Sequence, residues 1–285
     1  MPKTIFKMHG GKSYLAAWLY ELSPPSVWED RDRGYTHRTI AFAGGLNEIL
    51  SAQANWPVDG ISESVNDLNS ELSTFWRCLG SAALRDRLIT DLQLTPFSQV
   101  TWEESRRESM DPEQLSDPVY IAKNFFIRLR QSRQAVGKCY ATPTTRTRRG
   151  MHEHVSAWLT AVDGLMEVSQ RLLRVEVRCM DFEYFLLTYD HARAFHYLDP
   201  PYHPDTRAKN SCEYGEFEMD VPAHERLLQV LSCLNGKWML SGYHTPLYDE
   251  WAKKNDYHCF EKVIDAKSSS KKVKDTRIEC VWRNY

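Results

Sequence analysis

The sequence predicts an α/β fold in which a sheet of short, mostly parallel strands carries a long helical insertion. Short apolar runs that end at polar or glycine residues occur near both ends of the chain, as strands of a sheet do. Helical periodicity dominates the middle of the chain instead. Strands alternating with helices on both sides of one helical block indicate a sheet formed by residues 1–70 and 172–285, with residues 71–171 as the insertion.

The first part begins with a predicted buried strand over residues 38–43 (RTIAFA), which runs into the turn signal Gly44-Gly45. Residues 66–69 (NDLN) are typical of a strand end followed by a helix cap. The helix expected after them covers residues 69–79, where apolar side chains recur at helical spacing: Leu72, Phe75, Trp76 and Leu79.

The insertion is predicted to be mostly helical, with residues 119–130 and 155–173 as its clearest helices. Residues 133–150 differ, because they hold Gly137, Pro143 and a run rich in Thr and Arg. That composition predicts a loop or hairpin.

The last part is predicted to return to the sheet. Its strands are expected at residues 175–179, 195–198, 237–240 and 277–283, with an amphipathic helix at residues 223–234 and a polar loop at residues 268–272.

Composition excludes several classes of protein. The chain has 285 residues, of which 42% are hydrophobic and 26% charged, as in an ordinary globular protein rather than a disordered, collagen-like or histone-like one. No apolar run approaches the roughly 18 residues of a membrane helix, and the first residues lack the apolar stretch of a secretory signal. The seven cysteines include no CxxC pair, so neither a disulfide framework nor a metal site is expected, and a reducing, cytoplasmic location is the default.

The net charge of −2 conceals a strong asymmetry. Residues 118–152 contain no acidic residue and eight basic ones: Lys123, Arg128, Arg130, Arg133, Lys138, Arg146, Arg148 and Arg149. Removing these eight from the 36 basic residues of the chain leaves 28 against 38 acidic residues. A basic segment on an acidic body is typical of a surface that binds a polyanion, although charge runs can also be merely solvated helix faces.

The strongest chemical signal is the run Asp199-Pro200-Pro201-Tyr202, which follows a short apolar strand. Ligands of open α/β sheets bind at the carboxyl ends of the strands. The proline pair stiffens the backbone and removes two N–H donors, so nearby carbonyl groups can accept hydrogen bonds from a ligand. Asp199 adds an anionic acceptor and Tyr202 a flat stacking face, which together can hold a planar amine; the alternative is a turn with a capping Asp and a surface Tyr.

The order of several motifs along the whole chain resembles the Dam-type class of adenine-specific DNA methyltransferases. The motifs are GGKSYL, FAGGL, NDLN, DPPY, SGYHTPLYDEW and RIECVW. The resemblance implies a Rossmann-like methyltransferase sheet that binds S-adenosylmethionine (AdoMet), with residues 118–152 as the DNA-recognition loop of the helical insertion. It implies transfer of the AdoMet methyl group to the 6-amino group of an adenine flipped out of double-stranded DNA at a specific site.

The resemblance also implies which residues contact each ligand. Asp199, Pro200, Pro201 and Tyr202 would form the catalytic site, with Asp199 and the Pro200 carbonyl accepting from the amine. The AdoMet site would consist of His9, Gly10, Gly11, Lys12, Phe42, Ala43, Gly44, Gly45, Asp67, Leu68, Asp181 and Phe182. DNA would be bound by Lys123, Arg128, Arg130, Arg133, Arg146, Arg148, Arg149 and Arg207, through phosphates or guanine edges.

One part of the family pattern is altered. Ile40 and Ala41 stand where an acidic residue and a proline are usual, and Asn47 stands where a glycine is common. The missing acid removes a partner for the AdoMet ammonium group, which favours one alternative, a DNA-binding protein that has lost catalysis. Two others stay open: an enzyme acting on the 4-amino group of cytosine, which Asp rather than Ser before PPY disfavours, and an RNA or protein methyltransferase on the same sheet. The recognition site and any partner nuclease are not revealed by the sequence.

Overall fold

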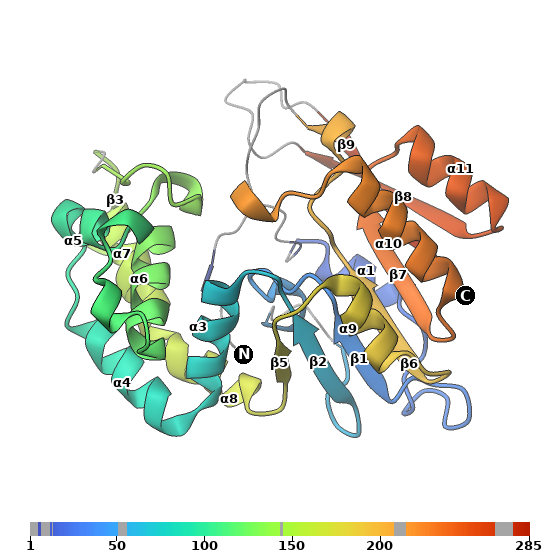
Figure 1. The fold of residues 1–285 in the computed structure, drawn as a ribbon, viewed down its shortest axis with the longest axis horizontal. Helices are drawn as coiled ribbons and strands as arrows, with labels where there is room; N and C mark the ends of the chain where they lie inside the picture. Colours follow the sequence, from blue (N-terminus) through green and yellow to red (C-terminus); the bar gives the residue numbers. More distant parts are fainter. Residues whose placement is uncertain are drawn as a thin grey trace. The chain divides into compact units, whose positions relative to one another are not determined.

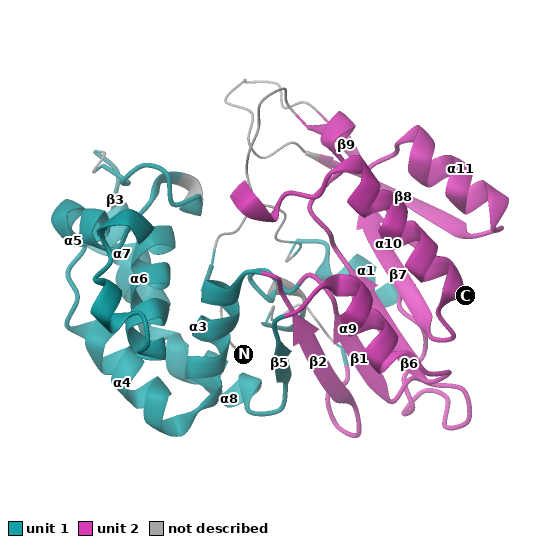
Figure 2. Ribbon diagram, viewed as in Figure 1, with its two compact units in different colours: residues 1–22, 43–56, 69–179 teal, residues 23–42, 57–68, 180–285 magenta. Residues whose placement is uncertain are grey.

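A computed structural model of the chain describes residues 5–6, 12, 14–50, 56–142, 145–207, 215–265 and 276–285. By its contacts the chain divides into two compact units (Figure 2). Unit 1 comprises Met1–Leu22, Ala43–Trp56 and Asn69–Cys179, and unit 2 comprises Ser23–Phe42, Pro57–Leu68 and Met180–Tyr285.

The fold is mixed α/β, with a mostly parallel seven-stranded sheet of order β5-β2-β1-β6-β7-β9-β8 (Figure 1). Its strands are β1 (His37–Ile40), β2 (Ser62–Asn66), β5 (Glu176–Arg178), β6 (Ala194–Leu198), β7 (Lys237–Gly242), β8 (His258–Asp265) and β9 (Thr276–Arg283). Strand β1 pairs in parallel with β2 and β6, and β6 pairs in parallel with β7. Strand β9 runs antiparallel to both β7 and β8. This arrangement confirms the predicted fold class, a Rossmann-like sheet.

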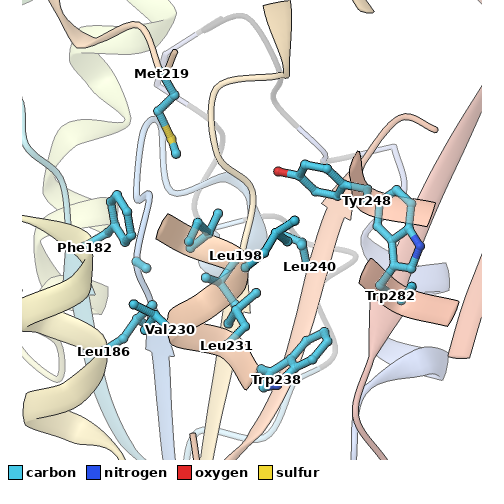
Figure 3. Packing of buried hydrophobic residues seen from close by; sticks show 14 of the residues in the cluster. Phe182, Leu186, Leu198, Met219, Val230, Leu231, Trp238, Leu240, Tyr248 and Trp282 are labelled. Carbon is cyan, nitrogen blue, oxygen red and sulfur yellow. The ribbon is translucent and has the colours of Figure 1, made fainter. Parts of the chain in front are cut away.

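Three helices of unit 2 alternate with strands along the chain. They are α9 (Phe182–Tyr189) between β5 and β6, α10 (Val221–Cys233) between β6 and β7, and α11 (Pro246–Lys254) between β7 and β8. Asp220 caps α10 by accepting from the Ala223 N–H at 2.9 Å, so the predicted helix at residues 223–234 begins slightly earlier. The apolar faces of these helices and strands form one buried cluster, to which Leu198, Leu231 and Leu240 belong (Figure 3). The core therefore supports the carboxyl ends of β6 and β7.

Unit 1 is mainly helical. Its helices are α1 (Ala16–Leu22), α2 (Asn47–Leu50), α3 (Ser70–Gly80), α4 (Ala82–Gln93), α5 (Gln99–Glu104), α6 (Pro118–Arg130), α7 (Glu153–Asp163) and α8 (Leu165–Leu172), with short 3-10 turns at Arg107–Ser109, Pro112–Gln114 and Arg133–Ala135. Aromatic side chains form its core: Phe6 packs edge-on against Phe75, Trp76 and Phe126 at centroid distances of 5.0–5.6 Å. The helical character expected for residues 71–171 is confirmed, while the boundary of a separate insertion domain stays a prediction.

Several elements differ from the expectation. The helix expected over residues 155–173 is two helices, with Gly164 between α7 and α8. The strand expected over residues 38–43 ends at Ile40. The region expected to be a loop or hairpin, residues 133–150, contains β3 (Thr147–Arg148) and a turn at Arg149 and Gly150, with φ of 58° and 73°. Strand β4 (Met151–His152) completes a hairpin just beyond the expected end of the region.

Strand β8 and helices α1, α9 and α11 were not predicted at all. The loop predicted at residues 268–272 lies outside the described residues. Among the residues that are described, no helix is both long enough and apolar enough to cross a membrane.

Candidate active site at the strand ends

The central strands of unit 2 end in register, which brings the chain segments that follow them to one edge of the sheet. Ile40 of β1 pairs with Val65 of β2 and with Tyr197 of β6. The pairing continues one step further, because the Ala41 N–H donates to the Tyr197 carbonyl at 3.3 Å. Phe42, Asp67 and Asp199 each lie just beyond this level, at the edge where ligands of open α/β sheets bind.

Asn66, the last residue of β2, ties three of these segments together. Its side-chain amide donates to the Ala41 carbonyl at 3.2 Å and to the Met180 carbonyl at 2.9 Å. Its Oδ1 accepts from the Met180 N–H at 3.0 Å. Asn66 was not among the predicted site residues, since nothing in a sequence shows which backbone groups an amide will meet.

This arrangement brings two predicted AdoMet residues into contact. The ring of Phe42 lies 5.6 Å from the ring of Phe182, centroid to centroid. Phe42 directly follows Ala41, and Phe182 lies two residues after Met180, so both rings belong to segments that Asn66 holds. They form an apolar surface at the strand edge that could pack against a purine.

Asp181 already has donors within unit 2. It caps α9 by accepting from the Glu183 N–H at 2.9 Å, and its Oδ2 accepts from Arg226 at 2.8 Å. The Arg226 guanidinium also lies 4.5 Å from the centroid of the Phe182 ring. A carboxylate has about four lone-pair sites, so Asp181 retains capacity to accept from a further amine.

Asp67 and Leu68 leave the end of β2 at the same level. Asp67 is half-buried and the Leu68 side chain is 56% exposed. An acidic residue at this position of a nucleotide-binding sheet accepts from ribose hydroxyl groups, and an exposed apolar neighbour suits the face of a base. Both residues lie at the sheet edge, and their contact with AdoMet stays a prediction.

The remaining predicted AdoMet residues belong to unit 1. Gly44 has φ of 46°, a conformation that favours glycine, and a Cβ built there meets no atom of the described residues within 4 Å. The Gly44 carbonyl accepts from the Trp76 indole at 3.2 Å, and the Ala43 carbonyl accepts from the Leu46 N–H at 2.8 Å. Gly45 continues this turn, which leaves open space above Gly44.

Lys12 is buried, and its carbonyl accepts from the Leu15 N–H at 2.8 Å just before α1. The predicted residues His9, Gly10 and Gly11 lie outside the described residues.

The Asp199-Pro200-Pro201-Tyr202 run follows β6 directly. Asp199 is half-buried, and the Tyr202 hydroxyl donates to both carboxylate oxygens of Glu279, at 3.3 and 3.4 Å. The Tyr202 ring lies 4.6 Å from the ring of Tyr243. Glu279 is fully buried on β9, so a carboxylate inside the sheet edge fixes the direction of the Tyr202 ring.

Sequence reasoning missed Tyr243 and Glu279 as site residues. Their proximity results from strand pairing. Gly242 of β7 pairs with Cys280 of β9 in an antiparallel register, so Tyr243 and Glu279 are the next residues on either side. The signal available in the sequence was their place inside the SGYHTPLYDEW and RIECVW motifs, without any role attached. The Arg277 guanidinium lies 5.6 Å from the Tyr243 ring, which extends the group.

A histidine pair supports the chain just after Tyr202. His203 caps the turn Pro204–Thr206 by accepting from the Asp205 N–H at 3.3 Å, and its ring lies 5.1 Å from that of His224. The Nδ1 of His224 is 2.8 Å from the Tyr248 hydroxyl. Burial, followed by the nearby charge of His203, lowers the pKa of His224 to about 4, so this ring is neutral at neutral pH.

Three of the predicted DNA-binding arginines are engaged in internal contacts. In unit 1, Arg128 donates to the Glu71 carboxylate at 2.6 Å and to the Ser105 carbonyl at 3.0 Å. Arg130 donates to the Ala157 carbonyl at 2.6 Å, and burial lowers its pKa to about 10. Arg207 of unit 2 forms an ion pair with Glu218. These side chains stabilise their own units.

Other basic residues of the predicted loop face solvent. Arg133 is exposed at the start of its 3-10 turn, and Arg146, Arg148 and Arg149 are exposed on or beside the β3–β4 hairpin. Arg149 also donates to the Thr160 hydroxyl at 2.9 Å. Lys123 is half-buried on α6, with its ammonium 5.9 Å from the Tyr120 ring. The hairpin therefore carries the densest exposed positive charge of the segment.

The comparisons with known proteins agree with the geometry at the strand edge. The sequence model of a family described as D12 class N6 adenine-specific DNA methyltransferase matches residues 9–268. A comparison with curated proteins finds no significant match.

Proposed function

Since the chain belongs to the D12 class of N6 adenine-specific DNA methyltransferases, we propose that it transfers a methyl group from AdoMet to the 6-amino group of an adenine flipped out of a specific DNA site. Adenine methylation of DNA is the activity of the family. We further propose that AdoMet is the methyl donor, that the adenine is flipped out of the duplex and that the enzyme acts at a specific site. The observation that carries it is the common register of Phe42, Asp67 and Asp199 at one sheet edge.

The residues at this edge fit the chemistry of AdoMet, which supplies an activated methyl group on a sulfonium. Asp67 would accept from the ribose hydroxyls, and Phe42 and Phe182 would pack against the adenine ring of the cofactor. Asp181 would accept from the amino group of that ring. In unit 1, the open space over Gly44 suits close approach of the backbone to a ligand, and Lys12 would pair with the carboxylate.

Asp199 would activate the target amine. The lone pair of an aromatic amine is delocalised into its ring, which makes the nitrogen a weak nucleophile. Hydrogen bonds from the amine to Asp199 and to the Pro200 carbonyl would favour a pyramidal nitrogen whose lone pair can attack the methyl carbon in line. The methyl–sulfur bond would break as the nitrogen–methyl bond forms, which would leave S-adenosylhomocysteine, and the methylated amine would then release one proton to solvent. The acceleration would come from positioning and electrostatics, with no covalent bond to the protein.

Tyr202 would provide the stacking face for the flipped base. Flipping costs a few kcal/mol, and stacking on an aromatic side chain recovers about 1–3 kcal/mol per base. The hydrogen bonds to Glu279 and the contact with Tyr243 hold the Tyr202 ring in place before the base arrives. A ring that is already oriented loses little conformational entropy on binding.

The exposed hairpin arginines of unit 1 support DNA as the substrate. Arg148 lies on β3, Arg149 lies in the two-residue turn that follows it, and Arg146 directly precedes the strand, in a segment with no acidic residue between positions 118 and 152. Guanidinium groups bind phosphate oxygens and guanine edges through paired N–H donors. We assign DNA contact to these exposed side chains rather than to Arg128, Arg130 and Arg207, which are half-buried in their own units.

The decisive experiment incubates the protein with methyl-labelled AdoMet and unmethylated DNA, digests the DNA and separates the nucleosides. We expect label in N6-methyldeoxyadenosine alone, and none with Asp199→Ala. The matched control is Asp205→Ala, which removes a 75% exposed carboxylate from the next turn and should retain activity. Label in N4-methylcytosine would instead support the cytosine reaction. Label in RNA or protein would show that DNA is not the substrate.

A second candidate function is DNA binding without catalysis, and one observation favours it. Ile40 and Ala41 are both buried, and the Ala41 carbonyl accepts from Asn66, so the end of β1 offers no acid to the cofactor ammonium. Calorimetric titration with AdoMet separates the two candidates. Heat of binding at micromolar to millimolar AdoMet supports the enzyme, whereas DNA binding without AdoMet binding supports the second candidate.

A further inference from the structure

A second cluster of reactive side chains lies in unit 2, on residues that the methyl-transfer proposal does not use. One ring nitrogen of His244 and the sulfur atoms of Cys259 and Cys280 all lie within 4.8 Å of one another. His244 follows β7, Cys259 is on β8 and Cys280 is on β9, so three elements contribute one ligand atom each. Such a convergence of imidazole and thiol groups is the donor set of a metal site.

Strand pairing explains why the two thiols meet. In the β8–β9 ladder, Cys280 stands opposite Glu261, and Cys259 stands opposite Trp282. Side chains of directly opposed residues lie on the same face of a sheet, and so do those of residues two apart on one strand. Cys259, Cys280 and Glu261 therefore share one face, where the Glu261 carboxylate lies 3.1 Å from the Nε2 of His244.

His244 is oriented as metal-binding histidines are. Its Nδ1 is 2.8 Å from the Asp249 carboxylate, and its Nε2 is 3.1 Å from the Glu261 carboxylate. When Asp249 accepts from the Nδ1–H, the lone pair of Nε2 can bind a metal ion, which would lie between Nε2 and the Glu261 carboxylate and replace their direct contact. Asp249 thus orients the His244 ring from α11.

From this geometry we propose that His244, Cys259, Cys280 and Glu261 form a tetrahedral zinc site. One imidazole nitrogen, two thiolates and one carboxylate oxygen are ligands that zinc accepts in four-coordinate sites. Ligand atoms around a tetrahedral zinc ion lie about 3.3–3.8 Å apart, given bond lengths of about 2.0–2.3 Å. The ligand atoms of His244, Cys259 and Cys280 lie within 4.8 Å of one another, and the Glu261 carboxylate lies 3.1 Å from His244. Side-chain rotations would bring these four groups to the separation that zinc requires.

The position of the cluster allows metal to enter and gives it a structural effect. Cys259 is exposed and Cys280 is fully buried, so the site opens to solvent on the β8 side. A bound ion would connect the end of β7 to the β8–β9 hairpin, in addition to the backbone hydrogen bonds. The proposal is independent of the methyl-transfer proposal, because neither the ligands nor the test involves AdoMet or DNA.

The test uses the full chain, reduced, freed of metal with a chelator and titrated with Co²⁺ as a spectroscopic probe. We expect one equivalent to produce a near-ultraviolet sulfur-to-cobalt charge-transfer band and the visible bands of a tetrahedral ion, both abolished by Zn²⁺. Cys259→Ser and His244→Gln, which alter exposed ligands, should weaken Zn²⁺ binding at least tenfold. Asp249→Asn should weaken it about 10- to 100-fold by releasing the His244 ring.

The control is Cys233→Ser, which removes an exposed thiol at the end of α10 and should bind Co²⁺ like the unmodified chain. A Zn²⁺-dependent rise in melting temperature should likewise occur in this control and not in Cys259→Ser. Absence of the charge-transfer band, or an unchanged band in Cys259→Ser, would overturn the proposal. So would mass spectrometry showing a Cys259–Cys280 disulfide in a protein whose reduced form binds no Co²⁺.

Discussion

At the scale of single residues, the hydrogen bond from Tyr202 to Glu279 is the feature that most directly shapes the candidate active site. Glu279 is fully buried, and a buried carboxylate that loses a donor pays a large desolvation penalty. The same bond fixes the ring on which a flipped base would stack. Stability and base binding therefore depend on one hydroxyl group.

Tyr202→Phe separates the ring from the hydroxyl. We expect the free energy of unfolding to fall by about 1–3 kcal/mol, the usual cost of removing a hydrogen bond to a charged group. Urea unfolding measures it. Tyr243→Phe is the control, because it removes a neighbouring hydroxyl and keeps the ring contact with Tyr202. Equal losses in the two variants would show that the Glu279 bond contributes nothing special.

His224 gives a pH dependence at the same scale. Its ring is fully buried next to His203 and the Tyr248 hydroxyl, with Arg207 and Asp220 also contributing to its field. Its pKa in the folded chain is about 4, against an ordinary value of 6.5. The unfolded chain therefore takes up a proton as pH falls below 6.5, while the folded chain does not until pH 4.

We expect the free energy of unfolding to fall as pH drops from 6.5 to 4, by up to about 3 kcal/mol from this group alone, and to level off below pH 4. His224→Gln keeps a polar group for Tyr248 and does not titrate, so it should flatten this part of the profile. Urea unfolding at a series of pH values provides the measurement. An unchanged acid slope in His224→Gln would assign the effect to other groups.

The residues of the site were predictable to different degrees. The Asp199–Tyr202 run could be proposed because its residue types carry their chemistry locally, whereas Phe42, Asp67 and Asp181 were proposed from the order of the family motifs. The roles of all these residues stay predictions. Asn66 and Glu279 could not be recognised, since their roles consist of hydrogen bonds to residues more than 20 and more than 70 positions away. Such roles exist only once the strand register is known.

At the scale of secondary-structure elements, a buried ion pair joins the two strands that end at the candidate site. Arg38 of β1 and Glu63 of β2 are opposite each other in the parallel register, and their side chains are almost fully buried. Removing one member leaves the other charge in a medium of low dielectric constant. The pair therefore ties β1 to β2 below the level of Phe42 and Asp67.

Glu63→Gln should lower the free energy of unfolding by about 3–5 kcal/mol, as breaking buried ion pairs does. The comparison is Asp86→Asn, which breaks the surface pair with Arg85 at a side chain that is 64% exposed and should cost less than about 1 kcal/mol. Thermal and urea unfolding of both variants provide the measurement. A Glu63→Gln variant as stable as Asp86→Asn would show that the pair does not join the strands.

Elements with strong apolar patterns were predicted, and those with mixed patterns were missed. β6 and α6 agree with the expectation within a few residues, because their apolar periodicity is continuous. β8 was missed because its sequence HCFEKVID places apolar and charged residues in adjacent pairs, which is neither the alternation nor the continuous apolar run that predicts a strand. The Cys259–Cys280 proximity was missed with it, since only the pairing of β8 with β9 creates it.

At the scale of the whole molecule, charge is divided unevenly along the chain. Residues 118–152 carry eight of the 36 basic residues and none of the 38 acidic ones. Outside this segment the chain is acidic and repels phosphate. Binding of DNA should therefore depend on local contacts made by the exposed side chains of the segment, rather than on the overall charge of −2.

This argument predicts how salt acts on DNA binding. Each phosphate contact contributes about 0.9 to the slope of log affinity against log salt concentration, so replacing Arg146, Arg148 and Arg149 by Ala should reduce the slope by about 2–3. Fluorescence anisotropy with duplex DNA over a range of salt concentrations measures it. The control replaces Arg33, Lys253 and Lys254, which are exposed, belong to unit 2 and carry the same total charge. Because that control changes net charge equally, a slope reduced to the same extent in both triple variants would mean that DNA responds to overall charge. A slope reduced only in the hairpin variant would mean that these three arginines neutralise phosphates directly.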